Sequence, residues 1–167
     1  MSDRQERSYD GEMMAKGREG ENAVTKWLVS LGKTVTSVAA NEFMQKQDVD
    51  ILFSGDDGVC HFGEIKTDHN MSRTHNFCFE IMRFYHPSGI YREGWAIKSP
   101  ADFLFVHTPD TGQIYCFVFD KLRDACVQYV RDKGKDIRST MVETDKSKTT
   151  LSLLIPLSAL FGTYTIA

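Results

Sequence analysis

Two short apolar runs joined by a turn rich in glycine and aspartate constrain the fold of this chain most strongly. The first run covers residues 48–53, the turn reads Ser-Gly-Asp-Asp-Gly over 54–58, and the second run covers 59–67. A turn of this composition between two apolar runs is typical of a β-hairpin. We therefore expect two antiparallel strands that bring their side chains within reach of each other.

The hairpin carries acidic and basic side chains at informative positions. Glu64 and Lys66 flank Ile65, and the two-residue period of a strand places the carboxylate and the ammonium on one face while Ile65 points into the core. Asp48 and Asp50 lie at the start of the first run. Asp50 is therefore expected within a side chain's reach of Glu64. Asp48 competes with Asp50 for this role, and Asp50 is preferred because it directly precedes the apolar residues.

An amphipathic helix is predicted ahead of the hairpin, beginning near residues 17–20 and ending at Gly32. Its apolar residues recur at three- and four-residue intervals: Val24, Trp27, Leu28 and Leu31. Glu21 lies three residues before Val24, on the flank of this apolar stripe and not on the solvent face. Because an unpaired buried charge is costly, Glu21 is expected to have a partner near the hairpin.

The crowded carboxylates favour a divalent cation. Two carboxylates on a buried surface repel each other unless a positive charge neutralises them. Oxygen-only ligands favour Mg²⁺, which completes its shell with water and phosphate oxygens, and Mn²⁺ is expected to substitute for it. A lysine beside such an ion can orient a water molecule, and its charge favours a phosphoryl transition state.

The order of these residues resembles the PD-(D/E)XK nuclease superfamily, which includes Holliday-junction resolvases, many restriction enzymes and phage nucleases. The pattern is Glu21 on a helix, Asp50 on a strand, and Glu64-x-Lys66 on the next strand. The sequence Gly-Glu-Asn-Ala-Val at 20–24, followed by Leu-Gly at 31–32, resembles the helix of the resolvase-like branch. The resemblance covers about residues 17–67 and continues more loosely to about 119. It departs from the family in one respect, because no proline precedes the acidic residue.

The resemblance implies a restriction-endonuclease-like α/β core, with a mixed central β-sheet flanked by helices, and Mg²⁺-dependent hydrolysis of phosphodiester bonds. It implies Asp50, Glu64 and Ile65 at the metal, with Glu21 as an auxiliary ligand or base. Lys66 is implied as the residue that orients the attacking water. The expected catalytic residues are therefore Glu21, Asp50, Glu64 and Lys66.

The rest of the chain is expected to complete one domain over residues 1–167, with residues 1–16 a flexible arm. Strands are predicted over 34–38, 77–82, 103–107, 114–119 and 151–155, and a second helix over 121–132. Residues 68–75, 86–100 and 134–148 are expected to form loops, the last of them mobile. This order of elements by itself indicates an α/β domain with a mixed sheet.

Charge is distributed unevenly along the chain. Twenty Lys and Arg against 23 Asp and Glu give a net charge of −3 and a pI near 5.9. Residues 1–65 contain seven bases and twelve acids, whereas residues 66–98 contain five bases and three acids. This balance excludes a polycationic protein that coats nucleic acid. It allows a metal-dependent one, because bound Mg²⁺ would supply positive charge where a phosphate binds.

The basic middle of the chain mixes bases with aromatic residues, which suits contacts to phosphates and exposed bases. The expected nucleic-acid contacts are Arg73, Asn76, Arg83, Arg92 and Lys98. The alternative is a solvated loop with Phe77, Phe79 and Trp95 in the core. Glu80 is a further candidate for the metal site.

The sequence thus favours a Mg²⁺-dependent endonuclease acting on branched or double-stranded DNA. A non-catalytic nucleic-acid- or protein-binding module on the same fold is the alternative, and a nuclease acting on RNA is also compatible with the pattern. Two-stranded substrates call for two sites, so a homodimer is a further expectation, with its interface on the aromatic strand or on residues 151–160.

A membrane partner is not expected, because no apolar run approaches the roughly 18 residues that a span needs. The first ten residues lack an apolar signal region, and the four cysteines have no CxxC spacing. These features favour a cytoplasmic location.

Overall fold

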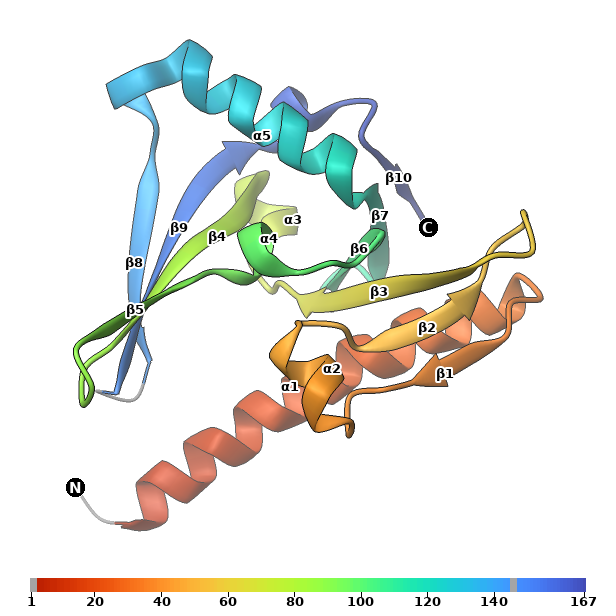
Figure 1. The fold of residues 1–167 in the computed structure, drawn as a ribbon, viewed down its shortest axis with the longest axis horizontal. Helices are drawn as coiled ribbons and strands as arrows, with labels where there is room; N and C mark the ends of the chain where they lie inside the picture. Colours follow the sequence, from red (N-terminus) through yellow and green to blue (C-terminus); the bar gives the residue numbers. More distant parts are fainter. Residues whose placement is uncertain (1–2, 145–146) are drawn as a thin grey trace.

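Two β-sheets with helices packed against them form the structure (Figure 1). The computed structural model describes residues 3–144 and 147–167, and the side chains of 17–142 and 147–167. The larger sheet contains β1 (Val35–Ser37), β2 (Ile51–Ser54), β3 (Cys60–Thr67), β6 (Phe103–Thr108), β7 (Gln113–Val118) and β10 (Tyr164–Ile166). The smaller sheet contains β4 (Asn76–Tyr85), β5 (Ile90–Glu93), β8 (Ser139–Thr144) and β9 (Lys148–Pro156).

The larger sheet is mixed and has the strand order β1-β2-β3-β6-β7-β10. β3 and β6 run parallel, and the remaining neighbours run antiparallel. β2 and β3 form the predicted hairpin, with Ile51 paired to Gly63 and Ser54 paired to Cys60. The expectation of a mixed central sheet flanked by helices is confirmed.

Helix α1 (Asp3–Ser30) covers one face of the larger sheet. Its Val24 and Leu28 are buried against Ile51, Ile65 and Phe105 from three neighbouring strands. The helix begins at Asp3, so residues 3–16 are helical where the sequence predicts a flexible arm; residues 1–2 lie outside the described part. The segment 3–16 contains no proline and is rich in Glu, Met, Arg, Lys and Gln, all of which favour helix.

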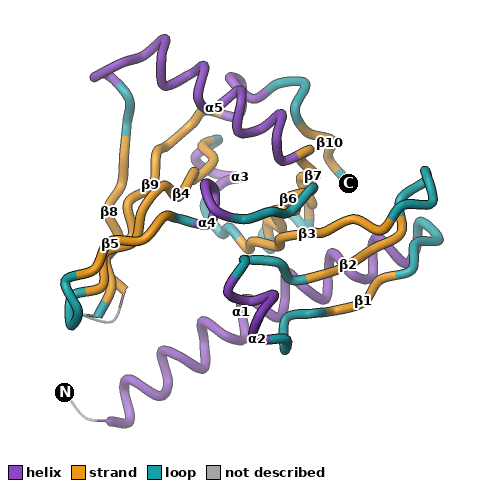
Figure 2. Tube along the Cα trace, in the orientation of Figure 1, coloured by secondary structure: helices purple, strands orange, loops and turns teal. Residues whose placement is uncertain are grey.

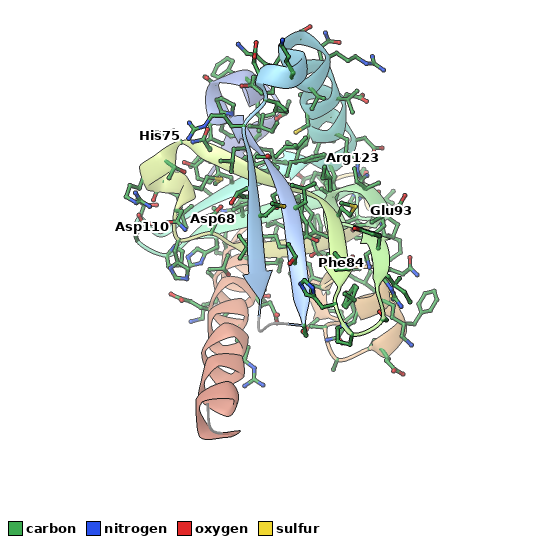
Figure 3. The ribbon with its side chains drawn as sticks, turned by 90° about the vertical axis from the view of Figure 1, so that its left-hand side faces the viewer. Asp68, His75, Phe84, Glu93, Asp110 and Arg123 are labelled. Carbon is green, nitrogen blue, oxygen red and sulfur yellow. The ribbon has the colours of Figure 1, made fainter. Side chains whose placement is uncertain are left out.

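The other face of the larger sheet is covered by α4 (Trp95–Lys98) and α5 (Phe119–Lys133). Leu104 and Val106 of β6 point into this second core, whereas Phe105 points toward α1, because successive side chains of a strand alternate. Arg123 joins the two helices, since its Nε donates to the carbonyl of Ala96 at 2.9 Å (Figure 3).

The smaller sheet has the order β5-β4-β9-β8 and contains strands where loops were expected (Figure 2). Residues 86–100 form β5 and α4, and residues 134–148 contain a turn of 3₁₀-helix (Gly134–Asp136) and β8, so both loop predictions were wrong. The segment 68–75 likewise contains the short helix α3 (Met71–Thr74). β5 is an edge strand that pairs with β4, and β8 is an edge strand that pairs with β9. The local sequence does not indicate these pairings, because they depend on distant segments.

The two segments expected at a homodimer interface contribute several residues to the core of this chain. Phe77 and Phe79 are buried in the core beneath α4 and α5. Ile155 at the end of β9 and Leu157 and Leu160 in the 3₁₀-helix Leu157–Leu160 are buried in the same core. These residues are therefore unavailable to a second copy.

None of the helices in the described part of the chain combines the length and the apolar character needed to cross a lipid bilayer. Helix α2 (Glu42–Lys46) leads into the hairpin and is capped by Asn41, whose side chain accepts from the amides of Phe43 and Met44.

Candidate active site

The hairpin brings Asp50 and Glu64 to opposite positions on neighbouring strands. Asp50 directly precedes β2, and its amide donates to the carbonyl of Gly63 at 2.9 Å. Because Ile51 pairs with Gly63 in an antiparallel register, Asp50 and Glu64 oppose each other one step further along. Oδ2 of Asp50 accepts a hydrogen bond of 2.8 Å from the amide of Ile65. The expected proximity of the two carboxylates is therefore present.

The carboxylate of Glu64 is buried and incompletely satisfied. The residue is 1% exposed, and its Oε1 contacts Nζ of Lys66. Its Oε2 is buried and has no hydrogen-bond partner among the described residues. Burial raises the pKa of Glu64 to about 8; Asp50 adds to this rise through repulsion, while the nearby ammonium of Lys66 opposes it.

Lys66 lies on the same face of β3 as Glu64 and reaches toward solvent. About 32% of its side chain is exposed, and its Nζ lies 5.2 Å from the centre of the Trp95 ring. Burial disfavours its charged form, but the nearby carboxylates of Glu64, Asp50 and Asp48 outweigh burial and raise the pKa of Lys66. Lys66 is therefore a cation that can donate hydrogen bonds.

Glu21 is half-buried on α1 and interacts electrostatically with the charged side chains of the hairpin. Burial and the charge of Asp50 raise the pKa of Glu21, while Arg18 and Lys66 lower it by less. The preceding residue, Gly20, explains how the helix comes so close, because a Cβ there would overlap Oγ1 of Thr67 and lie 3.6 Å from Cγ2 of Ile65. Helix α1 thus places Glu21 beside the end of β3.

The side chain of Ile65 belongs to the core between α1 and the sheet. It is 6% exposed and points to the face opposite Glu64 and Lys66. Ile65 can therefore reach a metal only through its main-chain carbonyl.

Asp48 makes ion pairs with two bases. Its Oδ2 lies 2.7 Å from Nζ of Lys98, and its Oδ1 lies 3.8 Å from Nη1 of Arg83. The hydroxyl of Ser99 donates to the carbonyl of Asp48 at 2.8 Å. Asp48 also has a φ of 52°, a conformation that aspartate tolerates better than most residues. These contacts favour a structural role for Asp48 and leave Asp50 as the better ligand.

Glu80 is held by neighbours other than the two hairpin carboxylates. Its Oε1 contacts Nε of Arg83 and accepts from the amide of Trp95 at 3.3 Å. The ring of Trp95 in turn lies over Lys66. A chain of contacts therefore runs from Asp48 through Arg83, Glu80 and Trp95 to Lys66. The alternative interpretation of this stretch, with Trp95 in the core, agrees with the structure, but the contact of Trp95 with Lys66 was not expected.

The five predicted nucleic-acid contacts do not form one surface. Arg83 and Lys98 are paired with Asp48, and Arg92 is exposed on β5. Arg73 and Asn76 lie at the opposite end of β4 and make local bonds, to Oδ1 of Asn70 at 2.9 Å and to the carbonyl of Thr74 at 2.8 Å. The ten residues of β4 span about 30 Å, so these two residues belong to a different region.

The carboxylate oxygens at the hairpin are suitable ligands for a hard divalent cation. Glu64 Oε2 is a buried acceptor without a partner in the described part of the chain, and Asp50 supplies a second carboxylate. Across the described residues, no group of three or more His, Cys, Asp or Glu is placed to hold a metal ion. An ion here would therefore rely on two carboxylates and a main-chain oxygen, with water and substrate oxygens in the remaining positions, as Mg²⁺ commonly does.

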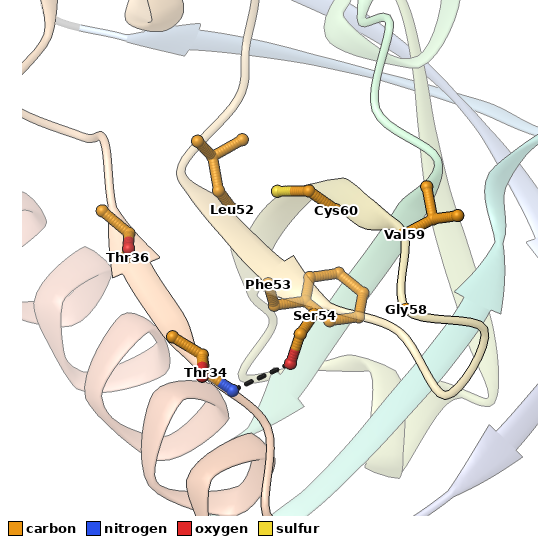
Figure 4. A pocket seen from close by; sticks show the side chains of 8 residues that line it. All are labelled: Thr34, Thr36, Leu52, Phe53, Ser54, Gly58, Val59 and Cys60. Atoms are coloured by element: carbon orange, nitrogen blue, oxygen red, sulfur yellow. Dashed lines mark hydrogen bonds between the residues drawn. The ribbon is translucent and has the colours of Figure 1, made fainter.

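A separate hollow of about 210 Å³ lies against the outer face of the hairpin, as Figure 4 shows. It is lined by Thr34, Thr36, Leu52, Phe53, Ser54, Gly58, Val59 and Cys60. The amide of Thr34 donates to Oγ of Ser54 across it at 2.9 Å. Its lining contains no carboxylate, basic residue or histidine, and its one titratable side chain is the thiol of Cys60.

The chain is similar to a solved structure, that of the bacterial homing endonuclease I-Ssp6803I, with a TM-score of 0.51 at 14% sequence identity. The match covers 66% of this chain and 72% of the endonuclease. The chain shares its fold with a nuclease. No family model matches the sequence, and no curated protein matches it either.

Proposed function

We propose that this protein is a Mg²⁺-dependent DNA endonuclease of the PD-(D/E)XK type that hydrolyses phosphodiester bonds. The observation that carries the proposal is the buried, incompletely satisfied carboxylate of Glu64, opposite Asp50 and in contact with Lys66. A carboxylate in this position is costly for the fold unless a cation uses it. The fold shared with a homing endonuclease supports the same conclusion.

The residues have distinct roles in this proposal. Asp50, Glu64 and the carbonyl of Ile65 would hold the ion, which when bound would stabilise negative charge on the phosphate and activate a water molecule. Lys66 stays protonated, so it orients the attacking water and favours the charged transition state as a hydrogen-bond donor. Glu21, whose pKa is raised by burial and by Asp50, is placed to accept a proton or to hold a second water.

Cleavage of defined nucleic acids tests the proposal. Linear, nicked, single-stranded and four-way-junction DNA, and an RNA of matching sequence, are incubated with the protein and Mg²⁺ or Mn²⁺. We expect cleavage of DNA that requires the ion, and its loss in Glu64→Ala and Lys66→Ala. Glu42→Ala is the matched control, because Glu42 is an exposed carboxylate on α2 whose Oε1 lies 3.6 Å from Nζ of Lys46. The proposal is overturned if the wild type cuts no substrate, or if Glu64→Ala and Lys66→Ala cut as well as it does.

A non-catalytic binding module on the same fold is the second candidate. The contact between Glu64 and Lys66 favours it, because a lysine that neutralises the buried carboxylate leaves less need for a cation. Titration calorimetry with Mg²⁺ and Mn²⁺ separates the two candidates. Binding that is lost in Asp50→Asn supports the nuclease, whereas DNA binding with no uptake of either ion supports the module.

A further inference from the structure

The register of the smaller sheet places three basic side chains on one face, near the end of β4 that carries Tyr85. Arg83 of β4 is directly opposite Arg92 of β5 and Thr150 of β9. Two residues along β4, Tyr85 is opposite Ile90 and Lys148. Directly opposite residues share a face of the sheet, as do residues two apart on one strand. Arg83, Tyr85, Arg92 and Lys148 therefore lie on one face, which we call the basic face.

The acidic residue of β5 lies on the reverse of this sheet. Glu93 is opposite Met82, and Tyr91 is opposite Phe84, so these four residues share the other face. Figure 3 labels Phe84 and Glu93 on this hairpin. The rings of Phe84 and Tyr91 lie 4.6 Å apart and pack on each other there. Charge is thus segregated between the two faces, with bases on one and the carboxylate of Glu93 on the other.

The basic face adjoins the candidate active site. Nη1 of Arg83 lies 3.8 Å from Oδ1 of Asp48, and Asp48 is two residues from Asp50. Arg83 connects the basic face to the hairpin that carries the two candidate metal ligands. A substrate strand leaving the site on this side would pass over β4 and its neighbours.

Among the described side chains, two of the three bases on this face have no carboxylate partner. Arg83 is neutralised by Asp48 and Glu80. Neither Arg92 nor Lys148 makes an ion pair with any side chain of residues 17–142 and 147–167. The guanidinium of Arg92 instead lies 5.5 Å from the centre of the Tyr85 ring. Because the Arg92 side chain is exposed and has no ion-pair partner among these side chains, its position suits an anionic ligand.

We propose that Arg92 and Lys148, on either side of Tyr85, bind the phosphodiester backbone of the DNA that the hairpin site cuts. The identity of the ligand as substrate rests on the proposed function, whereas the basic face itself rests on the strand register. β5 and β9 flank β4, so the two bases are about 10 Å apart and contact different phosphates. Tyr85 between them holds the Arg92 side chain across the sheet through its cation–π contact. Contacts of this kind position the substrate without reading its sequence.

Metal-free binding measurements test this proposal separately from cleavage. The affinity of the protein for a fluorescently labelled DNA duplex is measured by anisotropy in EDTA at several salt concentrations. Each phosphate contact contributes about 0.9 to the slope of log affinity against log salt. We expect Arg92→Ala and Lys148→Ala each to weaken binding and to lower this slope by about 1, and the double variant by about 2. Arg92→Gln, which keeps a long polar side chain, is expected to match Arg92→Ala.

Lys121→Ala is the matched control, because Lys121 is an exposed base at the start of α5 on the other side of the molecule. It should leave the slope unchanged. The proposal is overturned if Arg92→Ala and Lys148→Ala bind as the wild type does, if Lys121→Ala causes the same loss, or if an RNA duplex of the same sequence binds more tightly than the DNA. Loss of binding in the two variants without any cleavage by the wild type would support the basic face and reject the nuclease.

Discussion

The amide of Ile65 donates a hydrogen bond of 2.8 Å to Oδ2 of Asp50, and so holds the Asp50 carboxylate against β3 beside Glu64. The main chain of β3 thus positions the side chain of Asp50, the residue that directly precedes the neighbouring strand β2. Beside it, burial raises the pKa of Glu64 to about 8 and so disfavours the charged form of that carboxyl.

Asp50→Asn should separate the charge of this side chain from its structural role. The asparagine keeps an oxygen that accepts from the Ile65 amide, so the metal-free protein should unfold within about 1 kcal/mol of the wild type. Cleavage should fall by on the order of 100-fold or more, because a ligand charge is lost. Thermal unfolding and initial cleavage rates measure the two effects. Asp56→Asn, at an exposed aspartate of the hairpin turn, should leave cleavage unchanged; an equal loss in both variants would contradict the role of Asp50.

Glu64→Gln should make the metal-free protein more stable at alkaline pH while abolishing cleavage. The folded-state pKa of about 8 lies above the ordinary value of 4.5, so the folded protein binds a proton that the unfolded chain has released between these values. The stabilisation from this group is therefore complete below about pH 4.5 and is lost as the pH rises to about 8. At pH 8 the variant should be the more stable by about 4 kcal/mol, because each unit between the folded and unfolded pKa values of Glu64 is worth about 1.4 kcal/mol.

Urea denaturation at pH 5 and pH 8 in EDTA measures this pH dependence. The wild type should lose more stability than Glu64→Gln between these two values. A wild-type stability that rises over the same interval by more than that of the variant would show that Glu64 is ionised in the folded, metal-free protein.

Gly20→Ala should push α1 away from β3 and impair the site. The new Cβ would overlap Oγ1 of Thr67, so the helix or that side chain must shift, at a cost of about 1–3 kcal/mol. Gly17→Ala is the matched control in the same helix, because a Cβ at Gly17 meets nothing within 4 Å. It should stabilise the protein by about 0.5–1 kcal/mol through helix propensity alone. Thermal unfolding and cleavage of both variants check the contrast, and equal stabilisation by both would show that the close approach at Gly20 is unimportant.

Asp48→Ala should be more destabilising than Asp48→Asn. Both variants lose the ion pairs with Lys98 and Arg83, but only alanine is poorly suited to a φ of 52°. We expect a loss of about 1–3 kcal/mol for alanine and a smaller loss for asparagine, measured by urea denaturation. Cleavage by Asp48→Asn should persist at a reduced rate, because the residue supports Arg83 and Trp95 without holding the ion. Complete loss of cleavage in Asp48→Asn at wild-type stability would instead make Asp48 a ligand.

Several elements could be predicted from the sequence because their signals are local. The helix that carries Val24 and Leu28 shows a three- to four-residue period, and the β2–β3 hairpin is marked by its Gly/Asp turn. The hairpin register then follows from the turn, so the proximity of Asp50 and Glu64 was predictable as well. The edge strands β5 and β8 were not, because they exist through pairing with β4 and β9.

The sequence by itself determined which acidic and basic side chains share the hairpin, because turn chemistry and strand alternation act over a few residues. Only the tertiary structure decided how each charge is used. Asp48 meets Lys98 and Arg83 from distant segments, which turns a candidate ligand into an ion-pair partner. Glu64 is buried in the folded chain, which raises its pKa, while Arg92 and Lys148 are placed together by strands far apart in the chain. Burial and long-range pairing set these outcomes, and neither is encoded in the spacing of neighbouring residues.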